Sequence, residues 1–214
     1  MGTYKKGILG FFRGRVGTVV GAVWNGIHYM KSLPDVGDDN PTPAQLNVRA
    51  KLSLVTTFLK RLKALIKVGY QDFTNGITPM NAATSYHLKN AVTGTSSLNY
   101  AIDYSKVIFS VGDLLEANTP AVAVTTAAKL DFSWVNDAPA GGTGGTDKAT
   151  VLAYNVDKNK FATLAGAAAR SAAAYVLQLP PDWSGDEVYA WIAFVSADGK
   201  EVSNSSYIGQ FTVL

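Results

Sequence analysis

Few residues in this sequence could do chemistry. His28 and His87 are its two histidines, the side chains best suited to proton transfer near neutral pH. Neither has a carboxylate or a nucleophile motif beside it in the sequence. The chain has no cysteine, which excludes a disulfide framework, thiolate catalysis and cysteine metal ligands. We therefore predict no catalytic residue, no metal site and no cofactor, and a protein that is not an enzyme.

Two loops resemble ligand sites only superficially. Asp35, Asp38 and Asp39 supply oxygen ligands of the kind calcium prefers, but their spacing does not fit an EF-hand and the closing Glu is missing. The glycine-rich segment 141–148 lacks the Gly-Lys-Ser/Thr ending of a phosphate loop, and a strand pattern follows it where a helix is required. We expect a solvated, turn-rich linker and a loop between strands.

Charge is unevenly distributed along the chain. The net charge is +3, and only 16% of residues are charged. Residues 1–67 hold eleven Lys and Arg against three Asp, a net charge of +8, and the remainder holds eight against thirteen acids, a net charge of −5. A basic front and an acidic back favour either a polyanionic partner or head-to-tail pairing of copies.

The basic residues gather on one predicted helix, over residues 42–68. Thr42 and Pro43 are a typical cap and first helical residue, and Gly69 is a typical stop. At 100° per residue one side of this helix is apolar. The other side carries the candidate polyanion-binding residues, which are Arg49, Lys60, Lys63 and Lys67. The alternative is an ordinary solvated helix face, because no helix-turn-helix or other reading motif accompanies the charges.

Other N-terminal elements have clear signals. Asn25-Gly26 lies between two β-rich runs and predicts a hairpin over 15–33. Thr78-Pro79 begins a second helix that runs to about residue 92. Segment 99–111 has the pattern of a strand.

From about residue 118 the chain changes to short strands separated by turns. The alternation of Leu130, Phe132 and Trp134 with polar residues is typical of a strand with one buried face. Seven strands are expected, at 121–126, 129–135, 148–156, 160–164, 173–179, 187–196 and 206–213. We predict an α+β protein with a hairpin and helical region at 1–117 and an antiparallel β-sandwich at 118–214.

The strand at 187–196 is apolar on both faces, whereas a sandwich strand normally shows one face to water. Either the N-terminal region covers the outer sheet, or this face is a subunit interface, where Tyr and Trp are enriched. The candidate interface residues are Tyr189, Trp191 and Val195.

Two resemblances follow from these residues. Trp134 on an early strand and Leu179-Pro180-Pro181 before Val188-Tyr189 resemble an immunoglobulin-like or fibronectin type III module. The whole chain resembles an uncharacterised bacterial family of the domain-of-unknown-function kind. The residues that carry this second resemblance are Gly7-Ile8-Leu9-Gly10, the run 14–21, Trp24-Asn25-Gly26-Ile27, the run 41–46, Arg49-Ala50-Lys51 and the segments 194–196, 203–205 and 207–209. It implies no activity.

These observations favour a structural or protein-interaction component that self-assembles or belongs to a larger bacterial or phage assembly. The alternative function is binding of nucleic acid or another polyanion by the basic half. No apolar run is long enough to span a membrane, and the N-terminus lacks the core and cleavage site of a secretion signal. We therefore expect a cytoplasmic protein or a virion component, with a second copy or another protein as partner.

Overall fold

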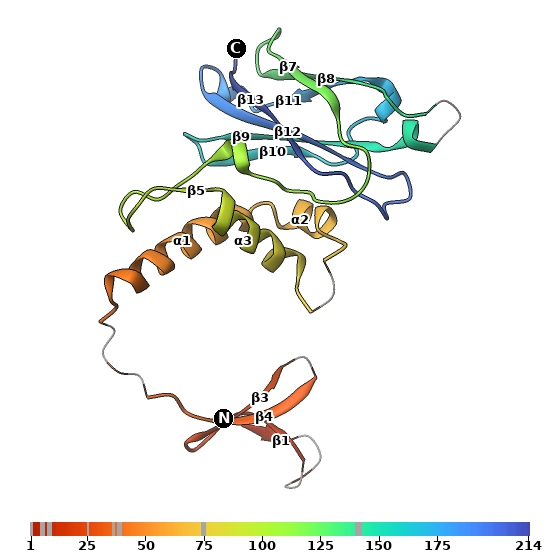
Figure 1. The fold of residues 1–214 in the computed structure, drawn as a ribbon. Coiled ribbons are helices and arrows are strands. Elements are labelled where there is room, and N and C mark those ends of the chain that lie inside the picture. The colour runs from red at the N-terminus through yellow and green to blue at the C-terminus, as the bar shows by residue number, and fades with distance from the viewer. Residues whose placement is uncertain are drawn as a thin grey trace. The chain divides into compact units, whose positions relative to one another are not determined.

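The computed structural model describes residues 2–4, 7, 10–24, 26–35, 37, 40–73, 76–139 and 143–214. The chain divides into two compact units, Met1–Thr42 and Pro43–Leu214, which are described separately (Figure 1). The expected boundary at 117/118 falls inside the second unit, where helices and sandwich share one core.

The N-terminal unit is a small antiparallel sheet of order β1-β2-β3-β4. Gly26 has a φ of +82° in the turn that joins the last two strands, as the predicted hairpin requires, while Asn25 lies outside the described residues. The single strand expected from residue 15 to 24 is instead two strands, because Gly17, with a φ of +60°, permits a tight turn. The strands are β1 Thr3–Tyr4, β2 Phe12–Val16, β3 Val19–Trp24 and β4 Ile27–Ser32.

The seven predicted sandwich strands are confirmed, with ends shifted by up to three residues. They are β7 Asn118–Ala123, β8 Lys129–Val135, β9 Lys148–Asn155, β10 Lys160–Leu164, β11 Ala174–Gln178, β12 Glu187–Val195 and β13 Ser206–Thr212. Three strands in the order β11-β8-β7 face four in the order β10-β9-β12-β13, and all pairs are antiparallel. This is an immunoglobulin-like sandwich of the fibronectin type III kind.

The sandwich core follows from the two-residue period of its strands. Leu130, Phe132 and Trp134 point inward from β8, as predicted, and meet Ile192 and Phe194 of β12. The rings of Trp134 and Phe194 lie edge to face, with centroids 5.6 Å apart.

Three helices precede the sandwich, and the two predicted helix starts are confirmed. The helices are α1 Pro43–Lys60, α2 Lys63–Gly69 and α3 Pro79–Asn90. The Thr78 hydroxyl accepts a hydrogen bond from the Asn81 amide at 3.3 Å and caps α3.

The predicted helix over residues 42–68 is interrupted rather than continuous. The Leu62 amide bonds to Leu59 three residues back, and the Arg61 side chain leaves the helix to bond Asn159 in the β9–β10 turn. The break keeps Leu59, Leu62 and Ile66 all buried.

The prediction of a strand at 99–111 is wrong. The segment contains only the short β6 Ala101–Ile102, paired with β5 Val92–Thr93, and the 3₁₀ turn η1 Tyr104–Lys106. Its apolar side chains are buried as in a strand, but its backbone bonds to scattered partners. The Phe109 amide, for example, donates to the Ser205 hydroxyl at 3.0 Å.

Three further 3₁₀ turns are η2 Thr143–Thr146, η3 Arg170–Ala172 and η4 Pro181–Trp183.

The helices form a third layer on the outer face of the four-stranded sheet (Figure 1). Val55, Leu59 and Ile66 from α1 and α2 share a core with Leu152 and Trp191 from β9 and β12. The unit therefore has two hydrophobic cores, one on each side of its central strands.

Candidate functional site

The two histidines do not form a catalytic arrangement. His87 is buried on α3, where Nδ1 lies 2.7 Å from the Ala83 carbonyl oxygen and Nε2 lies 3.4 Å from the Ile108 amide. The amide can only donate, so Nε2 accepts and Nδ1 carries the proton. Burial lowers the pKa of His87 and keeps the ring neutral. His28 lies on the exposed β4, with its ring stacked on Phe11 at a centroid distance of 3.6 Å. Both rings have a structural explanation.

The outer face of β12 is covered by the chain itself. Trp191 is 0% exposed, among the helices and 5.7 Å in ring-centroid distance from Tyr207. Tyr189 is half-buried and packs on Tyr104 at 4.5 Å. As a correction to the interface hypothesis, Trp191 has no surface to offer a second subunit. The other explanation, cover by the N-terminal region, accounts for both rings.

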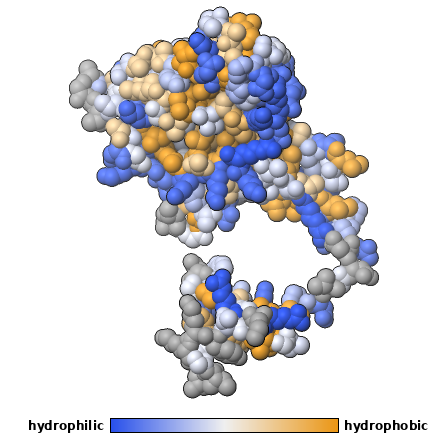
Figure 2. All heavy atoms as spheres, turned by 180° about the vertical axis from the view of Figure 1, so that it is seen from behind, coloured by the Kyte–Doolittle hydropathy of each residue, from blue (hydrophilic) through white to orange (hydrophobic). Residues whose placement is uncertain are grey.

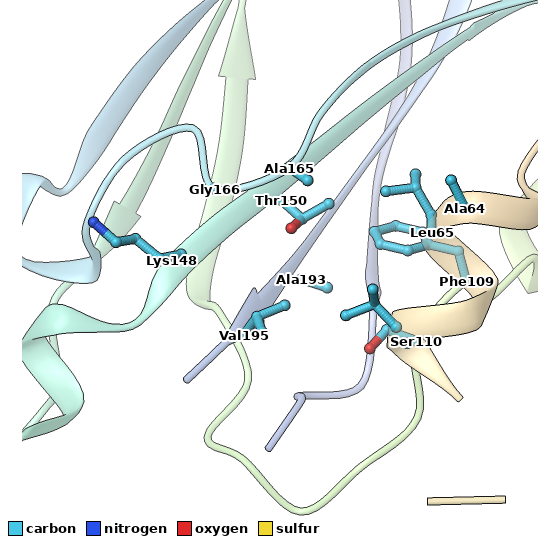
Figure 3. Close-up of a pocket in the computed structure, with 12 residues that line it drawn as sticks. Ala64, Leu65, Phe109, Ser110, Lys148, Thr150, Ala165, Gly166, Ala193 and Val195 are labelled. Carbon is cyan, nitrogen blue, oxygen red and sulfur yellow. The ribbon is translucent and has the colours of Figure 1, made fainter. Parts of the chain in front are cut away.

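Val195, the third candidate interface residue, lines an apolar cavity where the helical cover of the sheet ends (Figure 3). The cavity has a volume of about 460 Å³ and lies between α2 and the ends of β9 and β12. Leu65 of α2 and Phe109 face it from one side, and Ala193 and Val195 from the sheet. Small side chains on the sheet leave this space open because they do not reach the helix.

The chemistry of this cavity is limited to apolar contact. The Ser110 hydroxyl is committed to the Ser203 carbonyl oxygen at 2.6 Å, and the side chain of Lys148 extends away from Leu65 and Phe109 in Figure 3. Thr150 is the other hydroxyl in the lining. The cavity can take an apolar side chain or a small apolar molecule, but it presents no paired acid and base.

The candidate polyanion-binding residues are all exposed, but they do not form one straight row. Arg49 and Lys60 lie on α1, about 16 Å apart along the helix axis. Lys63 and Lys67 follow on α2, beyond the break at residues 61 and 62. No aromatic side chain is exposed on α1 or α2, since Phe58 faces the core. This surface therefore offers charge and no base-stacking group.

A buried ionic cluster around Arg170 was not predicted from the sequence. Arg170 is fully buried, with Nε 3.4 Å from an Asp147 carboxylate oxygen and Nη1 3.5 Å from Asp137. Nη1 also donates to the Glu116 carbonyl oxygen at 3.0 Å, and Nη2 donates to that of Leu115 at 2.5 Å. The guanidinium lies 3.9 Å from the Phe194 ring centroid. These partners come from three distant segments, so the cluster holds loops together. No sequence pattern marks it.

The N-terminal sheet differs from the sandwich because it has almost no interior. Among its described residues only Gly21 is buried, and β4 is exposed at every position. Exposed fractions reach 71% for Met30, 68% for Trp24 and 62% for Ile27. Figure 2 shows hydrophobic residues at the surface of this unit beside strongly polar ones. A sheet with so little packing is marginal on its own.

The pairing register assigns each side chain of residues 14–16, β3 and β4 to one of two faces, because directly opposed residues share a face. One, here called the valine face, contains no Lys, Arg, Asp or Glu. Its members are Gly14, Val16, Val19, Gly21, Val23, His28, Met30 and Ser32. The other, here called the basic face, contains Arg15, Val20, Ala22, Trp24, Ile27, Tyr29 and Lys31. The sequence suggested the basic residues but not this division.

Metal-binding groups and membrane-spanning helices can be sought only in the described residues. These residues contain no group of three or more His, Asp or Glu placed to hold a metal ion. Within the same ranges, no helix has the length and apolar character needed to cross a membrane.

Comparisons with known proteins identify a family and weak likenesses of fold. Among solved structures, the fn3 domain of human collagen alpha-1(XX) chain is 11% identical, with 46% of this chain and 84% of that chain covered and a TM-score of 0.35. The fn3 domain of human contactin 1 is 7% identical, with 57% and 89% covered and a TM-score of 0.29. None of the curated proteins matches the sequence. The model of a family of unknown function, DUF6266, matches residues 11–209. The chain therefore belongs to the DUF6266 family, which confirms the predicted resemblance to a domain-of-unknown-function family.

Proposed function

We propose that the protein is a non-enzymatic building block that associates with a second copy of itself through the valine face of its N-terminal sheet. The observation that carries the proposal is the exposure of this face. Val16, Val19 and Val23 are each about two-fifths exposed and Met30 is 71% exposed, although valine and methionine are usually buried.

Self-pairing is favoured because the valine face carries no formal charge. Two copies can approach through it in a symmetric contact, in which the same patch meets itself, without like-charge repulsion. The basic face would bring Arg15 and Lys31 against their own copies. Phe11 and Phe12 cover part of this face, at His28 and Gly21, and the contact would add a packed layer over the exposed remainder. A component of this kind suits a larger bacterial or phage assembly.

The test compares two lysine substitutions on neighbouring residues of β4. Met30→Lys places charges on the valine face, and Tyr29→Lys is the matched control because Tyr29 is exposed on the opposite face. Sedimentation velocity of the full chain over a concentration series should show self-association that Met30→Lys abolishes and Tyr29→Lys keeps. Neither change should alter thermal unfolding of Pro43–Leu214.

Two results would overturn the proposal. One is a monomer at every concentration. The other is an oligomer that survives Met30→Lys unchanged, which would place the contact elsewhere in the chain.

A further inference from the structure

The basic face of the N-terminal sheet combines cations and aromatic rings in a fixed order. Arg15, Val20 and Lys31 form one cross-strand row, Ala22 and Tyr29 the next, and Trp24 and Ile27 the third. One end of the face is therefore cationic, and the aromatic rings follow along the strands.

These groups are accessible. Trp24 is 68% exposed and Tyr29 43%, and Arg15 and Lys31 are both exposed. The Arg15 Nε donates to the Gly17 carbonyl oxygen at 3.1 Å, which holds the guanidinium beside the β2–β3 turn. Large exposed aromatic side chains beside cations are uncommon on a surface that meets only water, and they indicate a partner.

We propose that this face binds single-stranded nucleic acid, with phosphates at Arg15 and Lys31 and bases stacked on Tyr29 and Trp24. Successive rows on one face lie about 7 Å apart, two residues along a strand. That is about twice the 3.4 Å per nucleotide of a stacked strand, so it fits bases that have been splayed apart. Open sheet surfaces with aromatic side chains are well suited to such stacking, which needs no particular base sequence.

The aromatic rings distinguish binding of a single strand from binding of any polyanion by charge alone. A sulfated polysaccharide or a duplex has no free base to stack, so it would contact Arg15 and Lys31 and leave Trp24 unused. The lysines of α1 and α2 offer charge without a ring and serve as an internal comparison.

The experiment measures binding of a fluorescently labelled 20-nucleotide poly(dT) strand to the full chain by anisotropy, at several salt concentrations. Trp24→Ala should weaken binding roughly 5- to 150-fold, the range expected for one lost stacked base. Trp24→Phe keeps a ring and should recover most of the affinity. The plot of log K against log salt has a negative slope. Changing Arg15 and Lys31 together to Gln should make this slope less steep by about 1.4, because two phosphate contacts are lost.

Two controls keep the test specific. Changing Lys60, Lys63 and Lys67 together to Gln should leave affinity within about twofold, and so should Phe73→Ala, which removes an exposed ring from the other unit. Circular dichroism checks that each variant stays folded.

The proposal is overturned if poly(dT) does not bind at 50 mM salt, or if Trp24→Ala binds as tightly as the unchanged protein. It is also overturned if heparin or duplex DNA binds more tightly than the single strand, since charge would then suffice. Finally, loss of self-association in Trp24→Ala with unchanged poly(dT) binding would assign the face to a second copy.

Discussion

Replacing Trp191 by alanine tests whether the helical layer and the sandwich are one cooperative unit. The side chain is 0% exposed and lies in the core that joins α1 and α2 to β9 and β12. Removal of a fully buried Trp typically lowers the free energy of unfolding by about 3–5 kcal/mol. For a unit of this size, 1 kcal/mol corresponds to about 2–4 °C in Tm. We therefore expect a fall of roughly 6–20 °C in a single transition.

The Trp191→Phe variant tests how much of this loss of stability comes from the contacts of the ring. The indole Nε1 of Trp191 is buried and has no hydrogen-bond partner. An unsatisfied buried donor is unfavourable by about 1–3 kcal/mol, so its removal offsets part of the lost contact area. Phenylalanine should therefore lower Tm by less than half as much as alanine.

Calorimetry and circular dichroism of the full chain measure both variants, with Trp24→Ala as the control. Trp24 is exposed, so its loss should change the unfolding free energy by no more than about 0.5 kcal/mol. The shared core predicts that helix and strand signals fall together in Trp191→Ala. Separate transitions for the helices and the sandwich, or a Tm unchanged within 2 °C, would refute the reasoning.

Two further predictions concern Pro43–Leu214. Because burial lowers the pKa of His87, the unfolded chain binds a proton more readily below about pH 6.5, so stability should fall from pH 7 to 5 by up to about 1.4 kcal/mol per pH unit from this residue. Urea unfolding at both pH values should show a smaller loss in His87→Gln, and an equal loss would contradict the assignment. Ala193→Val adds two carbons to the cavity beside α2 and should raise Tm by roughly 3–6 °C, at about 0.8 kcal/mol for each buried carbon. A lower Tm in differential scanning calorimetry would mean that the space cannot be filled from β12.

Local patterns were sufficient for the sandwich strands and the helix starts. Period-two alternation in β8 and the Thr78-Pro79 cap depend on neighbouring residues only, and both are observed. The doubly apolar strand was also informative, since its outer face does require cover. The sequence could not decide what covers it, because α1 and β12 lie far apart in the chain.

The failures have tertiary causes. The helix break at Arg61 depends on Asn159, 98 residues away. Segment 99–111 has strand-like side chains, but beyond the short pairing of β6 with β5 its backbone bonds to a hydroxyl, a histidine nitrogen and the Gly69 carbonyl oxygen. Arg170 lies in an alanine-rich segment, and its acidic partners lie 23 and 33 residues away. Such contacts leave no periodic signal.

Two strands of the same chain explain why stability and binding are assigned to different units. In β12 the inner face contacts the sandwich core and the outer face contacts the helices, so its residues satisfy one another within Pro43–Leu214. In β4 all six residues are exposed, and the strand has ladder bonds to β3 and a ring contact between His28 and Phe11. A paired strand with so little packing contributes little stability, and its apolar side chains gain most from an outside partner. A tryptophan in β12 should therefore control unfolding, whereas Trp24, beside the turn into β4, should control the binding of single-stranded nucleic acid.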